Sequence, residues 1–318
     1  MHRHLPLADI GIAAAAYHLP GNPIDVTDWG PQQGATPELI ASLVSNGCRH
    51  FFSGPDISDA DSIAASIDKL SIDAPEWQKE VRYLVHAHTQ NFSMPAPPSS
   101  ILTELAARYA LELKLCFSVA HLACASIING ISLAAKLLQN DPEARYALIV
   151  SSDRTFGGSK YRLRPPGCIQ SDGSSAILLS KEKMRCRLGH ATMRNFAKLH
   201  EGPSNPATIA ATSRLTCFHS MQLLRDHSEE TGISLEDYAQ ILPVNADKHY
   251  WLKIAEGLHL DESHFFFDNI PKLGHANCAD LAINLIDRGF ALLDQGRFVV
   301  AFGQSNVGAH AALTLVPN

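Results

Sequence analysis

Apolar residues follow two patterns that alternate along the chain. Segments such as 36–46 and 62–72 repeat apolar residues at helical spacing, whereas 148–152 and 174–180 are short apolar runs typical of buried strands. Alternation of the two patterns predicts an α/β fold. Further strands are predicted at 9–17, 83–88, 115–120, 188–198, 238–244, 297–303 and 309–316, and further helices at 101–109, 206–227, 249–258 and 278–290.

The segment 117–137 contains Cys124 at the point where a small-residue turn gives way to a helix. This helix is apolar nearly all round, which is typical of a helix buried inside a large core. A thiol at the first turn of such a helix faces free backbone N–H groups and the positive end of the helix dipole, and both stabilise the nucleophilic thiolate. A core cysteine that acts as a small hydrophobic residue is the alternative interpretation of this segment.

The two halves of the chain, 1–181 and 182–318, each end in a strand, a helix and a strand rich in small residues. We therefore expect an internal structural duplication, with two α/β halves of similar build.

Composition excludes some classes of partner. The chain has 318 residues, of which 46% are hydrophobic and 18% charged, and its net charge is −6. A negative net charge gives no general attraction to nucleic acid or to an anionic membrane surface. No apolar run reaches the roughly 18 residues of a membrane span. We expect neither a nucleic-acid nor a membrane partner.

The seven cysteines indicate free thiols. Their number is odd, and neither a CxxC pair nor a zinc-ligand spacing occurs, so no metal site is predicted. Residues 1–20 do not have the layout of a signal peptide. Free thiols are typical of a reducing compartment, and we expect a cytoplasmic protein.

Five segments of the chain carry recognisable motifs: FSVAHLACAS at 117–126, QSDGSSAILL at 170–179, ILPVNAD at 241–247, KLGHAN at 272–277 and AFGQSNVGA at 301–309. Taken in order, they resemble motifs of the thiolase-fold condensing enzymes, and within them of β-ketoacyl-ACP synthase III. The resemblance implies a layered αβαβα architecture with two pseudo-duplicated halves, in which 1–181 carries the nucleophile, Cys124, and 182–318 carries its partners.

The chain departs from this family at two positions. The family uses a Cys, a His and an Asn for decarboxylating condensation, but Val244 occupies the His position and His275 the Asn position. Valine has no N–H to offer to an enolate. The remaining set, Cys124, His275 and Asp280, resembles the Cys–His–Asp triad of the acyltransferase branch. Asp280 would lie in the first turn of a helix, where the dipole keeps a carboxylate ionised.

The resemblance implies a ping-pong acyltransferase of secondary metabolism that needs no cofactor. An acyl group from acyl-CoA or an acyl carrier protein would pass through Cys124 to a hydroxyl or amine of a small molecule, deprotonated by His275. Backbone N–H groups at Cys124, Gly303 and Gln304 would form the oxyanion hole. Asn245 would bind the acceptor or acyl group. Met94 would reach into the acyl pocket of a second subunit, which implies a homodimer.

Two other functions stay open at this point. One is a carbon–carbon bond-forming enzyme of the ketoacyl synthase III type that has relocated its histidine to His275. The other is a non-catalytic subunit that pairs with an active synthase, although such a subunit has no reason to keep Cys124, His275 and Asp280 together.

Overall fold

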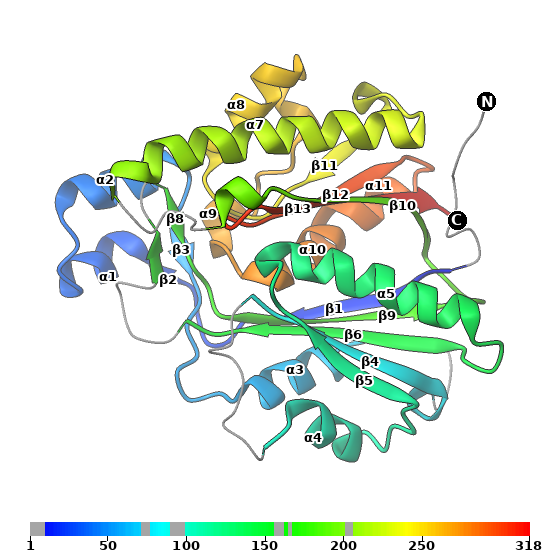
Figure 1. The fold of residues 1–318 in the computed structure, drawn as a ribbon. Coiled ribbons are helices and arrows are strands. Elements are labelled where there is room, and N and C mark those ends of the chain that lie inside the picture. Colours follow the sequence, from blue (N-terminus) through cyan, green and yellow to red (C-terminus); the bar gives the residue numbers. More distant parts are fainter. Residues whose placement is uncertain (1–9, 71–76, 90–98, 156–161, 165–166, 201–205) are drawn as a thin grey trace.

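The computed structural model describes the chain except for residues 1–9, 71–76, 90–98, 156–161, 165–166 and 201–205. Five layers lie on one another in Figure 1, in the order helices, strands, helices, strands, helices. The outer helices are α3 (Asp59–Ile67) and α4 (Ile101–Arg108) on one side, and α7 (Pro206–Thr231) and α8 (Lys248–Leu258) on the other. The central layer contains α5 (Ser126–Asn140) and α10 (Asp280–Asn284).

The strands of the first half lie in the order β1-β9-β6-β4-β5. Strand β9 is antiparallel to both of its neighbours, whereas β4 is parallel to β6 and to β5. The strands are β1 (Gly11–His18), β4 (Val81–Ala87), β5 (Leu115–Val119), β6 (Tyr146–Asp153) and β9 (Gly173–Ser180).

The second half repeats this order and these directions. Its strands lie in the order β10-β13-β12-β11, with β13 antiparallel to both neighbours and β11 parallel to β12. Where the first half has β5, Phe265 makes a single parallel bridge to Ile241. The strands are β10 (Cys186–Asn195), β11 (Gln240–Leu242), β12 (Val299–Gln304) and β13 (Ala309–Pro317).

The two sets of strands join into one nine-stranded sheet through β1 and β10. Among the described residues, two pairs make that junction, Gly11 with Arg187 and Ile12 with Cys186. Beyond it the two parts diverge and enclose the central helices (Figure 1). The layered fold with two similar α/β halves is therefore confirmed. The boundary between residues 181 and 182 stays a prediction; it falls between the end of β9 and the start of β10.

Helix α5 is buried between the two parts of the sheet, as its apolar sequence predicts. It contacts β4 and β6 on one side and β12 and β13 on the other. Ile127, Ile128 and Ile131 are buried, and each such side chain contributes about 1.5–3 kcal/mol. One position differs from expectation, because Leu133 keeps 37% of its surface exposed.

The helix predicted at 278–290 does not end at Gly289. A 3₁₀ turn (Asn277–Ala279) leads into α10, a π turn (Leu285–Gly289) follows, and α11 (Phe290–Leu293) continues beyond the glycine. A Cβ on Gly289 would lie 2.8 Å from side-chain carbons of Leu242 and Leu285. This glycine therefore permits close packing against β11 and is not a helix end.

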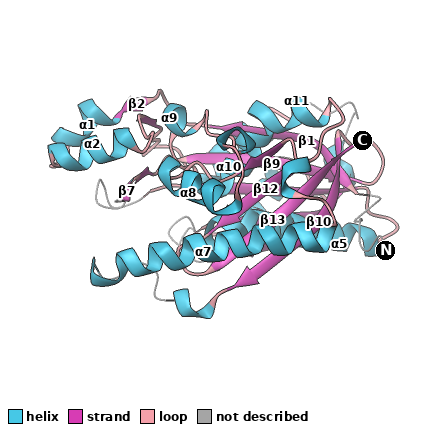
Figure 2. Cartoon of the chain, turned by 90° about the horizontal axis from the view of Figure 1, so that it is seen from above, coloured by secondary structure: helices cyan, strands magenta, loops and turns pink. Residues whose placement is uncertain are grey.

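Smaller elements complete the fold. Helix α1 was not predicted, because it contains Gly30 and Pro31, which disfavour helix. Together with α2 it lies at the opposite end of the molecule from the C-terminus (Figures 1 and 2). These elements are α1 (Val26–Gln32), α2 (Pro37–Ser45), β2 (Ile24–Asp25), β3 (His50–Phe51), β7 (Leu163–Arg164), β8 (Cys168–Ile169) and α9 (Ile270–Leu273).

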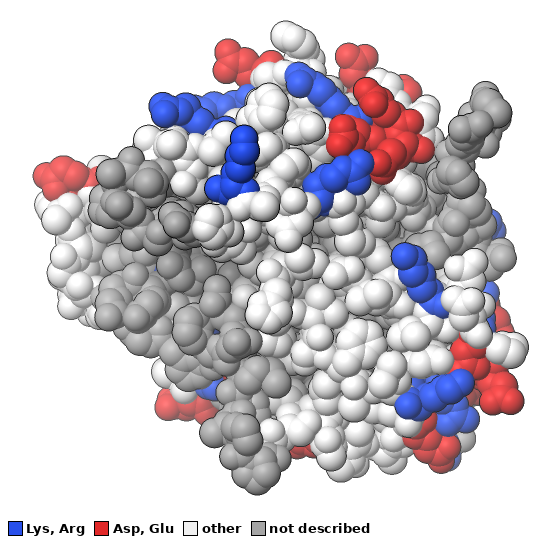
Figure 3. Space-filling model, viewed as in Figure 1, with Lys and Arg blue, Asp and Glu red and all other residues white. Residues whose placement is uncertain are grey.

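Surface charge is mixed on the face that Figure 3 shows. Basic and acidic side chains are scattered, and large areas between them are uncharged. Within the described part of the chain, no helix is both long enough and apolar enough to cross a membrane.

The contrast between two positions on α5 tests the central layer. Ile131→Ala should lower the free energy of unfolding by about 2–5 kcal/mol, because it empties space between the two parts of the sheet. Leu133→Ala, on the same helix but 37% exposed, should change that free energy by no more than about 0.5 kcal/mol. Urea unfolding measures both. Equal losses in the two variants would contradict the burial described here.

Candidate active site

Cys124 lies in a tight turn at the start of the central helix. The turn is a 3₁₀ segment, Ala123–Ala125, which leads directly into α5. Ala123 has φ +47°, in the left-handed region that a residue with a Cβ rarely adopts. Gly303 of β12 packs against the turn so closely that a Cβ there would lie 3.1 Å from the Cys124 carbonyl oxygen. The turn places the half-buried sulfur at the N-terminal end of the buried helix.

His275 reaches Cys124 from the second half of the chain. Its backbone N–H donates to the Ile169 carbonyl (2.9 Å), and its carbonyl accepts from Ser171 N–H (2.9 Å). Gly274 makes this approach possible, since its φ is +64° and a Cβ would lie 2.9 Å from the Ile169 oxygen. The ring Nε2 lies 3.2 Å from Cys124 Sγ.

Asp280 holds the other side of the imidazole. Its Oδ2 lies 2.5 Å from His275 Nδ1 and accepts from the Asn245 backbone N–H (2.7 Å). Its Oδ1 accepts from Ala276 N–H (2.8 Å) and from Asn245 Nδ2 (3.2 Å). Four donors thus face one buried carboxyl group.

The charges of its neighbours control the protonation of His275. Burial lowers the pKa of His275, but the charges of Cys124 and Asp280 and the hydrogen bonds to both outweigh it and raise that pKa well above its ordinary value. The site therefore favours an imidazolium placed between a thiolate and a carboxylate, which is the activated state of a nucleophilic cysteine.

The other buried cysteines are in a different environment. Burial raises the pKa of Cys48 to about 11 and that of Cys186 to about 12. Burial also raises the pKa of Cys278, which is fully enclosed and donates to the Ala123 carbonyl (3.5 Å). These groups stay protonated thiols at neutral pH.

Asn245, expected to bind acceptor or acyl group, has protein partners at both ends of its amide. Its Nδ2 donates to Asp280, and its Oδ1 accepts from Asn284 Nδ2 (3.0 Å). Asn284 Nδ2 also donates to the Pro243 carbonyl (2.7 Å), and Asn284 Oδ1 accepts from Asn269 Nδ2 (2.9 Å). The structure therefore places Asn245 behind the carboxylate, as part of its support. Asn284 and Asn269 could not be predicted as part of the site, because nothing in their spacing brings them together.

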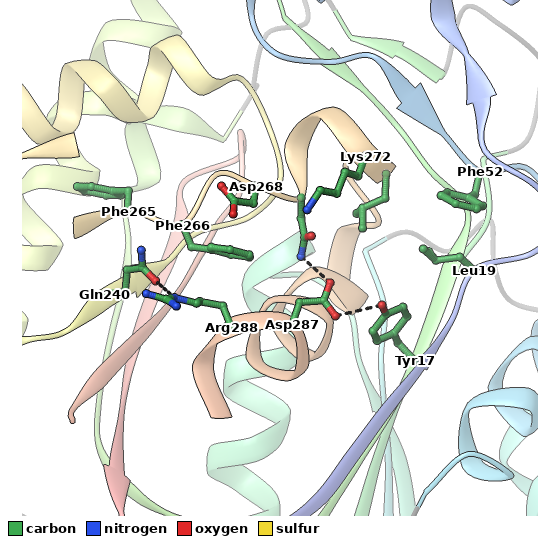
Figure 4. Close-up of a pocket in the computed structure, with 12 residues that line it drawn as sticks. Tyr17, Leu19, Phe52, Gln240, Phe265, Phe266, Asp268, Lys272, Asp287 and Arg288 are labelled. Carbon is green, nitrogen blue, oxygen red and sulfur yellow. Dashed lines mark hydrogen bonds between the residues drawn. The ribbon is translucent and has the colours of Figure 1, made fainter. Parts of the chain in front are cut away.

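This line of amides ends in the wall of a pocket. Asn269 also donates to Asp287 (3.0 Å), which accepts from the Tyr17 hydroxyl (3.1 Å), as Figure 4 shows. The pocket has a volume of about 700 Å³ and contains no member of the Cys124, His275 and Asp280 set. Its lining is mixed, with aromatic side chains such as Phe266 beside the charged Arg288, which donates to Gln240 (2.7 Å).

The remaining predicted positions have varied surroundings. Val244 is buried in an apolar cluster. The Gln304 side chain points toward α7 and α8, where its Oε1 accepts from Ser220 (2.9 Å) and Tyr250. Gly303 lies against the turn of Cys124. Backbone donation to an oxyanion from these positions stays a prediction, and Met94 lies outside the described residues.

Sequence reasoning missed Asn277. Its side-chain amide lies 3.9 Å from Cys124 Sγ, and its backbone has φ +55°. Asn277 is the last residue of the segment KLGHAN, but within that segment the resemblance assigns a role to His275 alone.

Known proteins resemble the chain in sequence and in fold. No family model matches the chain. It is 22% identical to β-ketoacyl-[acyl-carrier-protein] synthase III of Clostridium beijerinckii, over 93% of this chain and 96% of that protein.

Solved structures resemble the chain over nearly its whole length. The acyltransferase ChlB3 has a TM-score of 0.79 at 17% identity, covering 97% of this chain and 98% of ChlB3. A variant of OleA from Xanthomonas campestris has a TM-score of 0.80 at 14% identity, covering 98% and 99%. The synthase III FabH of Xanthomonas oryzae has a TM-score of 0.77 at 16% identity, covering 97% and 98%.

The chain has the thiolase fold. In this thiolase fold, the first half supplies Cys124, and the second supplies His275 and Asp280. These residues from the two halves meet because each half begins its central helix with the same kind of turn. Ala123–Ala125 leads into α5, and Asn277–Ala279 leads into α10. Both turns begin with a left-handed residue, Ala123 or Asn277.

The raised pKa of His275 makes the reactivity of Cys124 depend on that ring. Because the imidazolium persists above the ordinary histidine pKa of about 6.5, its positive charge supports the reactivity of Cys124 there. The positive charge on the ring is lost as pH rises through the raised pKa of His275. His275→Gln should therefore slow iodoacetamide alkylation of Cys124 at about pH 6.5 by at least about tenfold, since a free thiol ionises near pH 8.5.

Peptide mapping measures this alkylation, and the buried thiol of Cys278 in the same sample is the internal control. The difference between the two proteins should shrink above about pH 9, where an ordinary thiol is ionised without help. An identical pH profile in both proteins would show that His275 does not stabilise the thiolate.

Proposed function

We propose that this protein is an acyltransferase that moves an acyl group from an acyl-CoA or acyl-carrier-protein thioester, through Cys124, to a hydroxyl or amine of a small molecule. The observation that carries the proposal is the ring of His275, which contacts Cys124 Sγ through Nε2 and Asp280 through Nδ1. Similarity to a synthase that acts with an acyl carrier protein and to the acyltransferase ChlB3 supports the class of substrate.

In the first half-reaction, the thiolate attacks the carbonyl carbon of the donor thioester, and the carbonyl electrons move to oxygen. The oxyanion then collapses and breaks the bond to the sulfur of CoA or the carrier protein. That leaving sulfur takes the proton from His275 Nε2. Cys124 is now acylated, and the imidazole is neutral.

Acylation itself prepares the second half-reaction. The thiolate charge that raises the pKa of His275 is gone once the sulfur is acylated, whereas burial still lowers that pKa. The neutral imidazole can now remove the proton of the acceptor hydroxyl or amine as it attacks the acyl carbon. Collapse of the second oxyanion breaks the bond to Cys124 Sγ, which restores the thiolate beside the imidazolium. Asp280 holds the ring in place throughout.

The carboxylate distinguishes this reaction from decarboxylating condensation. Condensation needs neutral donors that hydrogen-bond an enolate oxygen, whereas acyl transfer to oxygen or nitrogen needs a base. Val244 offers no side-chain donor, and Asp280 makes His275 more basic. Condensation with a relocated histidine is the second candidate, favoured by the name of the Clostridium relative. A non-catalytic subunit is disfavoured, because the half-buried thiol of Cys124 and the buried side chains of His275 and Asp280 are brought together without a structural need.

Intact-protein mass spectrometry after mixing with a series of acyl-CoA and acyl-carrier-protein thioesters tests the proposal. We expect one acyl adduct, mapped to Cys124 and absent from Cys124→Ala. Adding an alcohol or amine acceptor should discharge it without release of CO₂. Asp280→Asn should slow the discharge by about 10²–10⁴-fold, because the imidazole loses the anion that makes it a base.

Two results would contradict the proposal. One is the absence of an adduct from every thioester of the series. The other is release of CO₂ from a malonyl thioester together with a carbon–carbon bonded product, which would favour the condensing enzyme. Asp280→Glu serves as the matched variant, because it retains the charge and should discharge faster than Asp280→Asn.

We also propose that the protein forms a homodimer through β5. This strand lies at the edge of the nine-stranded sheet, and Leu115 on it is 45% exposed. An apolar edge strand is a template for pairing with a second copy. Leu115→Lys should convert a dimer into a monomer in light scattering after gel filtration. Phe218→Lys, on the 53% exposed Phe218 of α7, is the control and should leave the mass unchanged. A wild-type monomer would overturn this proposal.

A further inference from the structure

Asn277 lies beside the reacting sulfur without a role in the triad. Its amide is 3.9 Å from Cys124 Sγ, and only 6% of its surface is exposed. It sits between His275 and Asp280 in the chain, so the loop that supplies the base also supplies this amide. The amide therefore lies within reach of a group bonded to that sulfur.

The amide can present a donor to the sulfur. Its oxygen and its nitrogen differ little in shape, and a half-turn about the Cβ–Cγ bond exchanges them. Toward a thiol, Oδ1 can accept the S–H, which is the contact at 3.9 Å. Toward a thiolate, which only accepts, the favourable orientation directs Nδ2 at the sulfur. The ionised site described above thus favours the donor orientation.

The backbone of the turn does not require this side chain. Asn277 has φ +55°, and the equivalent residue of the first half, Ala123, has φ +47° without any polar side chain. Glycine is the residue that adopts such a conformation at least cost. Asparagine tolerates it better than alanine does, so the backbone accepts this side chain, and the proximity of the amide to Cys124 Sγ is the observation that points to a role.

We propose that Asn277 is a catalytic residue, whose Nδ2 donates a hydrogen bond first to the Cys124 thiolate and then to the oxyanion formed on the thioester carbon. This inference rests on the proposed acyl transfer. As the sulfur attacks, its electron pair forms the bond to carbon, and the carbonyl pair moves to oxygen. The negative charge thus moves from the sulfur to an oxygen bonded to the same carbon. A single donor beside the sulfur can contact both atoms in turn. The same donor serves the second oxyanion, which collapses to release Cys124.

Two substitutions separate this role from a structural one. Asn277→Gly removes the amide and relieves the left-handed backbone, whereas Asn277→Ala removes the amide and retains the strain. We expect both variants to lose about 10²–10³-fold in the rate of Cys124 acylation and of discharge, the effect of deleting one oxyanion donor. Asn277→Asp should lose at least as much, since a carboxylate cannot donate and repels both the thiolate and the oxyanion.

His259→Gly is the matched control. His259 ends α8 with φ +59°, so this variant makes the same kind of backbone change outside the site and should leave both rates unchanged. Iodoacetamide alkylation of Cys124 provides a readout that needs no acyl donor, and its pH profile should move to higher pH in Asn277→Gly. Circular dichroism and the melting temperature verify that each variant is folded.

The failures of the two proposals are distinguishable. If wild-type protein forms no acyl adduct, acyl transfer fails, whereas an alkylation profile shifted in Asn277→Gly would still support the amide as a donor to the thiolate. If wild-type protein acylates and discharges, but Asn277→Gly does so at the same rates with an unchanged alkylation profile, the catalytic role of Asn277 is overturned.

Discussion

Burial of the Asp280 carboxylate is the constraint on which the rest of the site depends. A charge removed from water is costly unless hydrogen bonds replace its hydration. Here four donors do so, from Asn245, Ala276 and His275. Two of them are backbone N–H groups, so the anion is tied to the path of the chain on two sides. Of these donors, His275 is the one that also contacts Cys124 Sγ, so its ring links the carboxylate to the reactive sulfur.

The line of three asparagines extends this support. Asn269 donates to Asn284, Asn284 to Asn245, and Asn245 to Asp280, so all three amide dipoles point the same way. The Pro243 carbonyl can only accept, and its bond from Asn284 fixes that direction. Hydrogen bonds in such a chain strengthen one another. The aligned dipoles therefore stabilise negative charge at Asp280, while the outer end of the chain meets the solvent at the pocket of Tyr17 and Asp287.

Some of this arrangement could be predicted from sequence, and some could not. The burial of α5 follows from its apolar residues. Cys124 and His275 lie in segments that resemble family motifs, and Asp280 follows from the resemblance to a Cys–His–Asp triad. Asn284 and Asn269 could not be found this way, because a hydrogen bond between side chains 15 residues apart depends on how α9 and α10 pack, and local patterns carry no record of that packing. The packing role of Gly289 could not be predicted for a similar reason, since a glycine that permits close packing and a glycine that ends a helix look the same in sequence.

Duplication of the fold explains why the nucleophile comes from one half of the chain and its polar partners come from the other. Each half begins its central helix with a turn whose first residue is left-handed, and the two turns face each other, because Cys278 of one donates to the Ala123 carbonyl of the other. The first turn holds its cysteine half-exposed at the meeting point, whereas the second holds Cys278 fully buried. Near the second turn, the side chains that contact the site are those of Asn277, before Cys278, and of Asp280, the first residue of α10. One backbone design thus supplies a nucleophile from one copy and its polar partners from the other, and the difference between them lies in which side chain each turn exposes.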